Sequence, residues 1–195
     1  MNSKFALVTG ASSGIGMEIA TYLASKGINI LLTARREERL QKLSENLSKE
    51  YSVSVDYIAC DLSNGNAPND IYDFCKSKDY QIDILINNAG YGIKTSFHET
   101  PMEDEEKFIR VLGTSVIALT KIFLPDMIAR QNGKIMIVSS VAAFSPPSSI
   151  QALYGPIKTF MNRFSDSINI NYSQDGITST ALCPGFTVTE FHASS

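Results

Sequence analysis

Two side chains capable of acid–base chemistry, Tyr154 and Lys158, are four residues apart in a segment with helical character. At this spacing both side chains project from one face of a helix. A phenol with its ordinary pKa near 10 is a poor base at neutral pH, but a neighbouring ammonium stabilises the phenolate and lowers the phenol pKa. Such a pair could exchange a proton with a substrate oxygen. A Tyr and a Lys at this spacing also occur often on exposed helices without any chemistry, so the interpretation depends on the rest of the chain.

A glycine-rich segment near the start of the chain, TGASSGIG at residues 9–16, could bind phosphate. It follows a short apolar run at residues 5–8 and opens a helical segment. Glycines let the backbone turn sharply and approach a pyrophosphate without a Cβ clash, and the helix directs its free N–H groups and positive dipole end at the phosphates. The alternative is a glycine-rich turn without a ligand. Because the segment lies between a strand and a helix, phosphate binding is favoured.

The elements that position these groups are short apolar runs alternating with longer amphipathic segments. Strands are predicted at residues 5–8, 28–32, 53–59, 82–86, 134–138 and 177–182, and helices at residues 14–25, 36–49, 67–78, 102–112, 114–131 and 154–172. Continuous apolar runs are typical of strands buried on both faces. The alternation predicts an α/β fold, a doubly wound parallel sheet of the Rossmann type with helices on both faces. With no repeat or linker, residues 1–195 are expected to form one domain whose motifs meet at the carboxyl ends of the strands.

Composition limits the classes of partner. The net charge of −3 over 195 residues offers no broad positive field, so nucleic acid and anionic membranes are not expected partners, and no run approaches the ~20 apolar residues of a membrane span. The cysteines, Cys60, Cys75 and Cys183, lack disulfide or zinc spacing, and His98 and His192 stand alone. We therefore expect no metal site, a reducing compartment and a cytoplasmic location.

The spacing of the glycine segment, T-G-x-x-x-G-x-G, is similar to that of the short-chain dehydrogenase/reductase family. The resemblance extends along nearly the whole chain: residues 87–90 read N-N-A-G, residues 154–158 fit Y-x-x-x-K, and residues 184–189 resemble P-G-x-x-x-T. It implies an enzyme that transfers hydride between a nicotinamide dinucleotide and a small carbonyl or alcohol substrate.

The resemblance also implies roles for particular residues. Ser140, Tyr154 and Lys158 would be catalytic, with Ser140 orienting the substrate oxygen and Lys158 also binding the nicotinamide ribose. Ser139 is the alternative serine, and either serine could be only a cap or turn residue. The residues assigned to the cofactor are Gly10, Ser12, Ser13, Gly14, Ile15, Gly16, Arg35, Asp61, Leu62, Asn88, Ala89, Gly90, Tyr154, Lys158, Pro184, Gly185, Thr187 and Thr189.

The end of the second predicted strand indicates which dinucleotide is bound. An acidic residue there would hydrogen-bond the ribose 2′-OH of NAD. This chain has Thr33-Ala34-Arg35-Arg36, in which Ala34 cannot make that bond and Arg35 offers a planar cation for a 2′-phosphate. The alternative is that both arginines merely open an exposed helix. We expect NADP(H) to be preferred, with NAD(H) as the second option.

Departures from the family pattern leave a second function open. Leu112 stands where the family often has an asparagine that holds a water near the lysine, and Ile157 replaces a small polar residue; Thr114 or Ser115 could substitute for the asparagine. The sequence stops at Ser195, before the family's seventh strand and substrate-covering region, which predicts exposed apolar surface and an unpaired sheet edge. The alternative to an enzyme is a catalytically weak dinucleotide-binding sensor or scaffold.

An oligomer is also expected. Family members often pair through the two helices predicted at residues 114–131 and 154–172, which favours a homodimer or homotetramer. Both helices carry wide apolar faces, which include Ile117, Phe123, Leu124, Phe160, Phe164 and Ile168.

Overall fold

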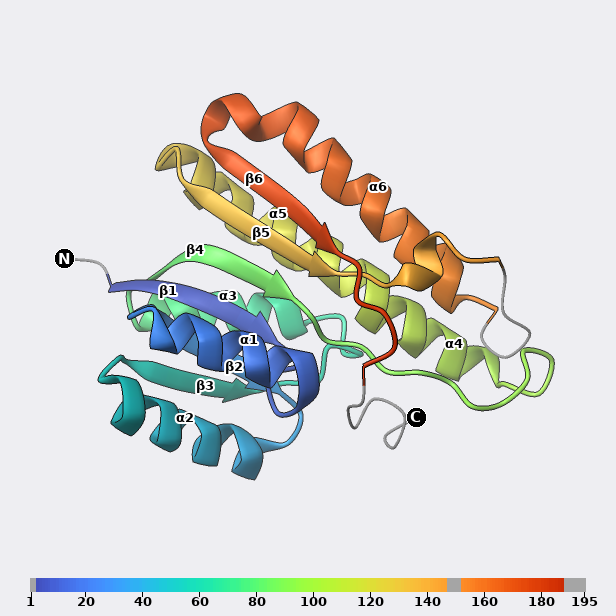
Figure 1. Ribbon diagram of the computed structural model, residues 1–195, viewed down its shortest axis with the longest axis horizontal. Coiled ribbons are helices and arrows are strands. Elements are labelled where there is room, and N and C mark those ends of the chain that lie inside the picture. Colours follow the sequence, from blue (N-terminus) through green and yellow to red (C-terminus); the bar gives the residue numbers. More distant parts are fainter. Residues whose placement is uncertain (1–2, 147–151, 188–195) are drawn as a thin grey trace.

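A computed structural model describes residues 3–146 and 152–187, in which six parallel strands form one sheet. Their order is β3-β2-β1-β4-β5-β6. The strands are β1 (Ser3–Thr9), β2 (Asn29–Ala34), β3 (Val55–Ala59), β4 (Tyr80–Asn87), β5 (Gly133–Val138) and β6 (Ile177–Leu182) (Figure 1). Because chain order reverses between β1 and β4, the loops after these two strands diverge there, and this switch point is where doubly wound sheets bind ligands.

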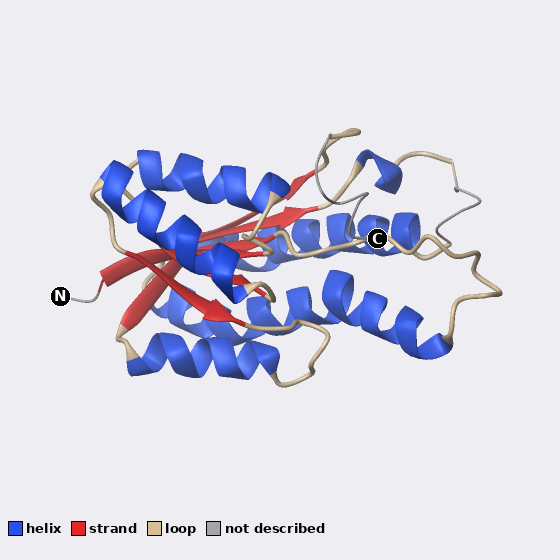
Figure 2. Cartoon of the chain, turned by 90° about the horizontal axis from the view of Figure 1, so that it is seen from below, coloured by secondary structure: helices blue, strands red, loops and turns tan. Residues whose placement is uncertain are grey.

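Helices cover both faces of the sheet (Figure 2). They are α1 (Gly14–Ser25), α2 (Glu37–Tyr51), α3 (Ala67–Ser77), α4 (Met102–Ile109), α5 (Ser115–Ala129) and α6 (Tyr154–Tyr172), with short turns η1 (Arg110–Thr114), η2 (Val141–Ala143) and η3 (Ser173–Asp175). One apolar core lies between α1, α2 and the sheet, and a larger one between α3 to α6 and the opposite face. The predicted doubly wound fold is confirmed.

The central strands are apolar throughout because both of their faces are covered. In β1, Leu7 belongs to the core under α3 to α6 and Val8 to the core under α1 and α2, and both are fully buried. Leu31 and Leu32 of β2 divide in the same way. The continuous apolar runs in the sequence therefore reflect two helical layers, as expected for a parallel sheet.

The two helices predicted at residues 102–112 and 114–131 are one continuous helical segment, so the predicted break is wrong. α4 passes through a single π-helical stretch, η1, directly into α5. The backbone N–H of Ser115 donates to the Arg110 carbonyl, and the Ser115 hydroxyl donates to the Val111 carbonyl at 2.8 Å. The serine side chain thus supplies a partner for a carbonyl where the regular helical hydrogen-bond pattern is interrupted.

By length and composition this segment, Met102–Ala129, passes the test for a membrane span, with a hydropathy of 1.6. The expectation that no segment approaches such a span was therefore too strong. In the fold, 56% of its most apolar window is buried, and Leu119, Phe123 and Met127 belong to the core against the sheet. The core helix of an α/β domain meets the same criterion because one broad face must be apolar.

Most of the apolar residues expected at an oligomer interface belong to the core instead. Phe123, Leu124 and Ile168 are buried, whereas Phe160 is 55% exposed. The apolar surface that these helices present outward is therefore narrower than their composition suggests.

β6 is an edge strand of the described sheet, as expected, but its outer edge is paired by a side chain at Ser179. The N–H of Ser179 donates to the side-chain oxygen of Asn169 at 2.7 Å, and the Asn169 amide donates to the Ser179 carbonyl at 2.5 Å. An amide from α6 thus occupies the position of a neighbouring strand at this residue. The face of β5 and β6 opposite α5 is seen without a covering helix in Figure 1, and it exposes Lys134, Thr178 and Thr180 rather than a continuous apolar surface.

Two glycines with the same backbone conformation allow a matched test of the connections between layers. Gly176 and Gly27 have φ of +75° and +76°. A Cβ on Gly176 would overlap the Gln131 carbonyl, whereas a Cβ on Gly27 would meet nothing within 4 Å. We expect Gly27→Ala to lower the free energy of unfolding by about 1 kcal/mol through the left-handed backbone alone, and Gly176→Ala by about 3 kcal/mol or more through the added clash. Urea denaturation of both variants measures the difference; equal losses would show that the Gln131 contact is unimportant.

Candidate active site

A cavity of about 1570 Å³ lies at the carboxyl ends of the strands and spans the switch point. It contains most of the residues predicted for the site. Those that line it are Gly10, Ser12, Ser13, Gly14, Ile15, Arg35, Asp61, Leu62, Asn88, Ala89, Gly90, Ser140, Tyr154, Lys158, Pro184, Gly185 and Thr187. Thr189 lies outside the described residues. Gly16 is not among the lining residues; it packs against Asn88 and Gly10.

The glycines of the first loop are required by backbone geometry. Gly10 and Gly14 have φ of +65° and +57°, a region that disfavours residues with a Cβ. A Cβ on Gly10 would lie 2.8 Å from the Ala89 Cα, and one on Gly16 would overlap the Asn88 amide and the Gly10 carbonyl. Gly16 therefore permits close packing of α1 on the loop. Its predicted contact with the cofactor stays a prediction.

Hydrogen bonds join this loop to the end of β4. The Thr9 hydroxyl accepts from the backbone N–H groups of Asn88 and Ala89, at 2.9 and 3.0 Å, and donates to the Ile86 carbonyl. The Asn88 amide donates to the carbonyls of Thr9 and Gly10. Asn88 thus fixes the shape of the glycine loop in addition to lining the cavity.

The start of α1 suits an anionic group. Ser13 precedes the helix and makes no side-chain capping hydrogen bond. The first N–H groups of a helix have no partner within the helix, and the dipole places partial positive charge there. With the left-handed Gly10 and Gly14 lining the cavity beside these N–H groups, the residues present fit the pyrophosphate of a dinucleotide.

Two arginines follow β2 at the same end of the cavity. Arg35 lines the cavity as predicted. Arg36, which was not predicted as a site residue, lines it too, and its guanidinium donates to the hydroxyls of Ser12 and Ser13 at 3.0 and 2.8 Å. The consecutive arginines were visible in the sequence, but only the fold shows that the second one reaches the glycine loop.

The two candidate serines, Ser139 and Ser140, differ in what they contact. Ser139 is 2% exposed, and its hydroxyl donates to the Lys158 carbonyl at 3.1 Å. Ser140 opens η2, where its hydroxyl accepts from the Ala142 N–H, and it hydrogen-bonds the Tyr154 phenol. Ser139 therefore fixes α6 to the sheet, and Ser140 is the serine adjacent to the phenol.

Burial controls the ionisation of Tyr154 and Lys158. The Lys158 amine donates to the Val138 carbonyl at 2.7 Å and lies 5.5 Å from the centre of the Tyr154 ring. Burial lowers the pKa of Lys158 to about 8, although the nearby Cys183 opposes this shift. Burial raises the pKa of Tyr154, and the hydrogen bond with Ser140 partly offsets the rise. The expected lowering of the phenol pKa by the ammonium is therefore wrong for this structure, because desolvation disfavours both charged forms.

Leu112 cannot supply the polar group that the family places at its position. It is 1% exposed and packs close to Gly90. Ser115, a proposed substitute, is buried with its hydroxyl on the Val111 carbonyl. The structure therefore gives no side-chain replacement at Ser115 for the missing asparagine.

Sequence reasoning missed residues that reach the cavity from loops and helix faces. They are Tyr91, Lys107, Val111, Val141, Ala142 and Phe186. Tyr91 follows β4, Lys107 and Val111 lie on α4 and η1, Val141 and Ala142 form part of η2, and Phe186 follows β6. Only the fold brings these segments to one cavity. Within residues 3–146 and 152–187, no three His, Cys, Asp or Glu side chains gather as metal ligands.

The lowered pKa of Lys158 has a measurable effect on stability. Between pH 8 and 10.5 the unfolded chain retains a proton on this amine that the folded chain has released, so the free energy of unfolding rises with pH. We expect the free energy of unfolding of the wild type to rise relative to that of Lys158→Met by up to about 3 kcal/mol over this pH range. Urea denaturation at several pH values tests this, with Lys134→Met on β5 as the exposed control. Parallel curves for wild type and Lys158→Met would contradict it.

Comparison with known proteins agrees with this geometry. The family model for short chain dehydrogenase matches residues 4–195. The very-long-chain 3-oxoacyl-CoA reductase of Rattus norvegicus is 32% identical over 96% of this chain and 60% of its own length. The inactive hydroxysteroid dehydrogenase-like protein 1 of Homo sapiens is 31% identical over 98% of this chain and 58% of its own length. The chain thus spans about three fifths of these curated relatives.

Solved structures show the same arrangement. A short-chain dehydrogenase from Sphingobium yanoikuyae in complex with NADPH superimposes with a TM-score of 0.92 at 31% identity, covering 98% of this chain and 74% of that one. A bulky-bulky ketone specific alcohol dehydrogenase from Comamonas testosteroni gives 0.89 at 30% identity, covering 96% and 74%. On its fold, its motifs and these matches, the chain belongs to the short-chain dehydrogenase/reductase family of oxidoreductases.

Proposed function

We propose that this protein is an NADP(H)-dependent oxidoreductase that transfers hydride between the nicotinamide and a carbonyl or alcohol substrate. The observation that carries the proposal is the chain of contacts from Ser140 to Tyr154 to Lys158 in the same cavity as the glycine loop. A protein that only binds a nucleotide has no need of a phenol held in this way.

The residues of the site have distinct tasks in this reaction. The bound dinucleotide would supply or accept the hydride. The Tyr154 phenol, whose pKa is raised by burial, is protonated at neutral pH and can donate its proton to a carbonyl oxygen. Ser140 lies beside the phenol and can hydrogen-bond the same oxygen. Lys158 sits beneath both, on the Val138 carbonyl, and keeps α6 in register with the end of β5.

The preference for NADP(H) is supported by the charges at the end of β2. Arg35 and Arg36 line the cavity next to the hydroxyls of Ser12 and Ser13. Guanidinium groups and hydroxyls together form a suitable environment for a 2′-phosphate. The Sphingobium relative is in complex with NADPH, and a metagenomic short-chain oxidoreductase 30% identical to this chain is in complex with NADP.

A catalytically weak sensor or scaffold is the second candidate. It is favoured by one observation, the apolar Leu112 packed on Gly90 where the family often has asparagine. The inactive hydroxysteroid dehydrogenase-like protein 1 of Homo sapiens is consistent with loss of activity among relatives of this chain.

The enzyme proposal is tested at the phenol. Tyr154→Phe keeps the ring that packs near Phe108 and removes the hydroxyl. We expect kcat to fall by about 10²–10⁴-fold, while the dissociation constant for NADPH stays nearly unchanged because the glycine loop is elsewhere. Stopped-flow rates and NADPH fluorescence titration measure the two effects. Wild-type turnover in the variant would exclude Tyr154 as the acid, and a parent that binds NADPH but reduces no carbonyl compound would favour the sensor.

Cofactor choice is tested at the arginines. Arg35→Ala should weaken NADPH binding by about 10- to 150-fold, equivalent to 1.5–3 kcal/mol of charge-assisted hydrogen bonds, and should change NADH binding little. Arg36→Ala should weaken both nucleotides, because its guanidinium also holds the loop serines. Arg163→Ala, exposed on α6, is the control. Equal losses of NADPH and NADH in Arg35→Ala would refute its assignment to the 2′-phosphate.

A further inference from the structure

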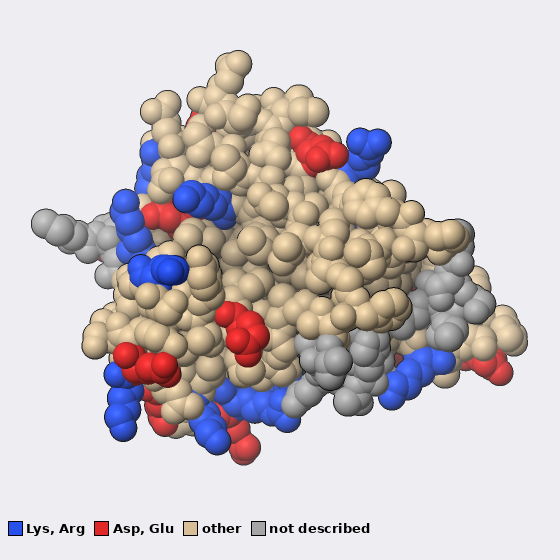
Figure 3. All heavy atoms as spheres, viewed as in Figure 1, with Lys and Arg blue, Asp and Glu red and all other residues tan. Residues whose placement is uncertain are grey.

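The substrate end of the cavity is chemically unlike its nucleotide end. Charged residues of the lining gather around Tyr91: Arg35, Asp61 and Lys107 all act electrostatically on its phenol. The described lining that follows Ser140, namely Val141, Ala142, Ala143, Ser145 and Pro146, carries no charged side chain. In Figure 3, charged side chains of both signs cover α2, whereas the described surface around η2 is largely without them.

The polar side chains at this end are already engaged by the backbone. The Thr159 hydroxyl donates to the Ala143 carbonyl at 2.9 Å, and the Ser145 hydroxyl donates to the Val141 carbonyl at 3.0 Å. The Lys158 amine donates to the Val138 carbonyl. Among the described side chains here, Ser140 and Tyr154 are therefore the hydroxyls placed to receive a substrate oxygen.

The remaining residues at this end of the cavity form a wall of small apolar side chains on the short turn η2. Val141, Ala142 and Ala143 form η2, which is held by the Val141 N–H on the Pro184 carbonyl and by Ser140 on Ala142. The backbone carbonyl of Ala142 lies so near α6 that a Cβ on Gly155 would come within 3.2 Å of it. Val141 is 40% exposed, and Phe186, which also lines the cavity, is 99% exposed. Small residues on a rigid turn leave room beside the reacting oxygen, and the surfaces that bound this room are apolar.

We propose that the substrate of this site is a neutral carbonyl compound with a bulky apolar substituent, which packs against Val141, Ala142 and Ala143. The reaction in this inference rests on the proposed hydride transfer. The preference for an apolar substituent rests on the wall formed by Val141, Ala142 and Ala143. Each buried methylene contributes about 0.8 kcal/mol, equivalent to about a 4-fold change in affinity. Binding a substrate hydroxyl here without a hydrogen-bond partner costs the free energy of its hydration, and binding a carboxylate costs more. Polar and charged substrates are therefore disfavoured.

A series of 2-alkanones, from butanone to decanone, tests the inference with the wild-type protein and NADPH. We expect kcat/KM to rise about 3- to 4-fold per methylene until the wall is filled, and pyruvate and a ketohexose to be at least 100-fold poorer than the best alkanone. The matching 2-alkanols are titrated onto the protein–NADP⁺ complex by calorimetry, so that apolar binding is measured without turnover.

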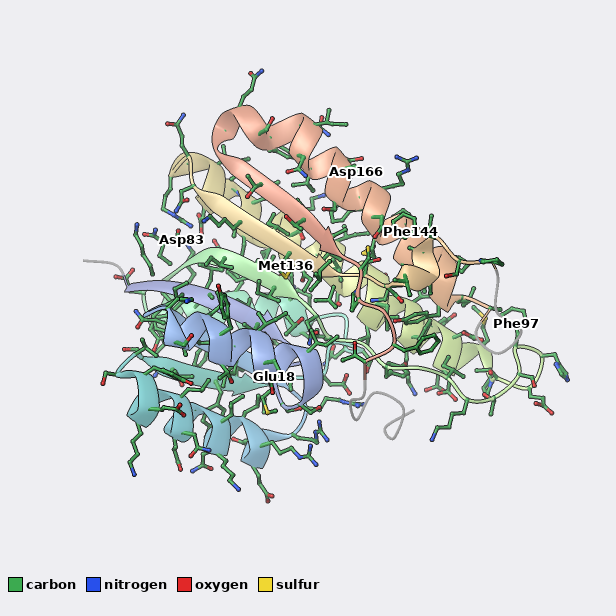
Figure 4. The ribbon with its side chains drawn as sticks, in the orientation of Figure 1. Glu18, Asp83, Phe97, Met136, Phe144 and Asp166 are labelled. Atoms are coloured by element: carbon green, nitrogen blue, oxygen red, sulfur yellow. The ribbon has the colours of Figure 1, made fainter. Side chains whose placement is uncertain are left out.

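Val141→Asp and Phe144→Asp form a matched pair. Phe144 directly follows η2, is 76% exposed and does not line the cavity (Figure 4). Val141→Asp should lower kcat/KM for the longest alkanone at least 10-fold and flatten the dependence on chain length. Phe144→Asp should retain the wild-type dependence.

The outcomes separate this inference from the proposed function. Turnover of pyruvate or the ketohexose at rates equal to the alkanones, or no dependence on chain length, overturns the apolar substrate and leaves hydride transfer standing. Alkanol binding that strengthens with length, without any turnover, supports the apolar site and overturns the enzyme. Failure of both binding and turnover overturns both, and equal effects of the two Asp variants overturn the assignment to Val141.

Discussion

The contact between the glycine loop and the end of β4 is the constraint on which the site depends. At the switch point two chain segments leave the sheet in opposite directions, and a cavity exists only if both are held apart in fixed positions. Thr9 and Asn88 do this with reciprocal hydrogen bonds between side chain and backbone. Gly10 and Gly16 allow the approach because a Cβ at either would meet Asn88 or Ala89. The groups that fit a pyrophosphate are thus the same groups that close the fold at its centre.

The catalytic end is positioned by a second set of contacts, between β5 and α6. The Ser139 hydroxyl bonds the Lys158 carbonyl, and the Lys158 amine bonds the Val138 carbonyl, so strand and helix exchange one hydrogen bond in each direction. Tyr154, one helical turn before Lys158, is thereby set beside Ser140 at the strand end. An amine used in this way is buried, and its lowered pKa is the electrostatic consequence of its position.

The fold and most of the site could be predicted from the sequence because they depend on local signals. Each of these signals lies within one element or one loop. They are the continuous apolar runs of the strands, the glycine spacing of residues 9–16, and the Tyr154–Lys158 pair. What was missed is visible only in the packed fold. The helix continues from α4 into α5 through the π-helical stretch η1, where the Ser115 hydroxyl bonds the Val111 carbonyl, and no sequence motif marks this stretch. The packing of Gly16 under Asn88 joins residues that are far apart in the chain. Arg36 was passed over because helix-opening and loop-binding arginines look alike in a sequence, and its serine partners are more than 20 residues away.

The electrostatics of the site also bear on the direction of the reaction. A phenol with its pKa raised by burial is a proton donor at neutral pH, whereas alcohol oxidation requires it as phenolate. Burial also disfavours the charged form of Lys158, the ammonium that would favour phenolate, so burial favours the neutral form of both groups. An apolar substrate against η2 excludes more water and strengthens both effects, because desolvation acts on each charged form in the same sense. The proposed apolar substrate and the protonated phenol are therefore consistent with one another.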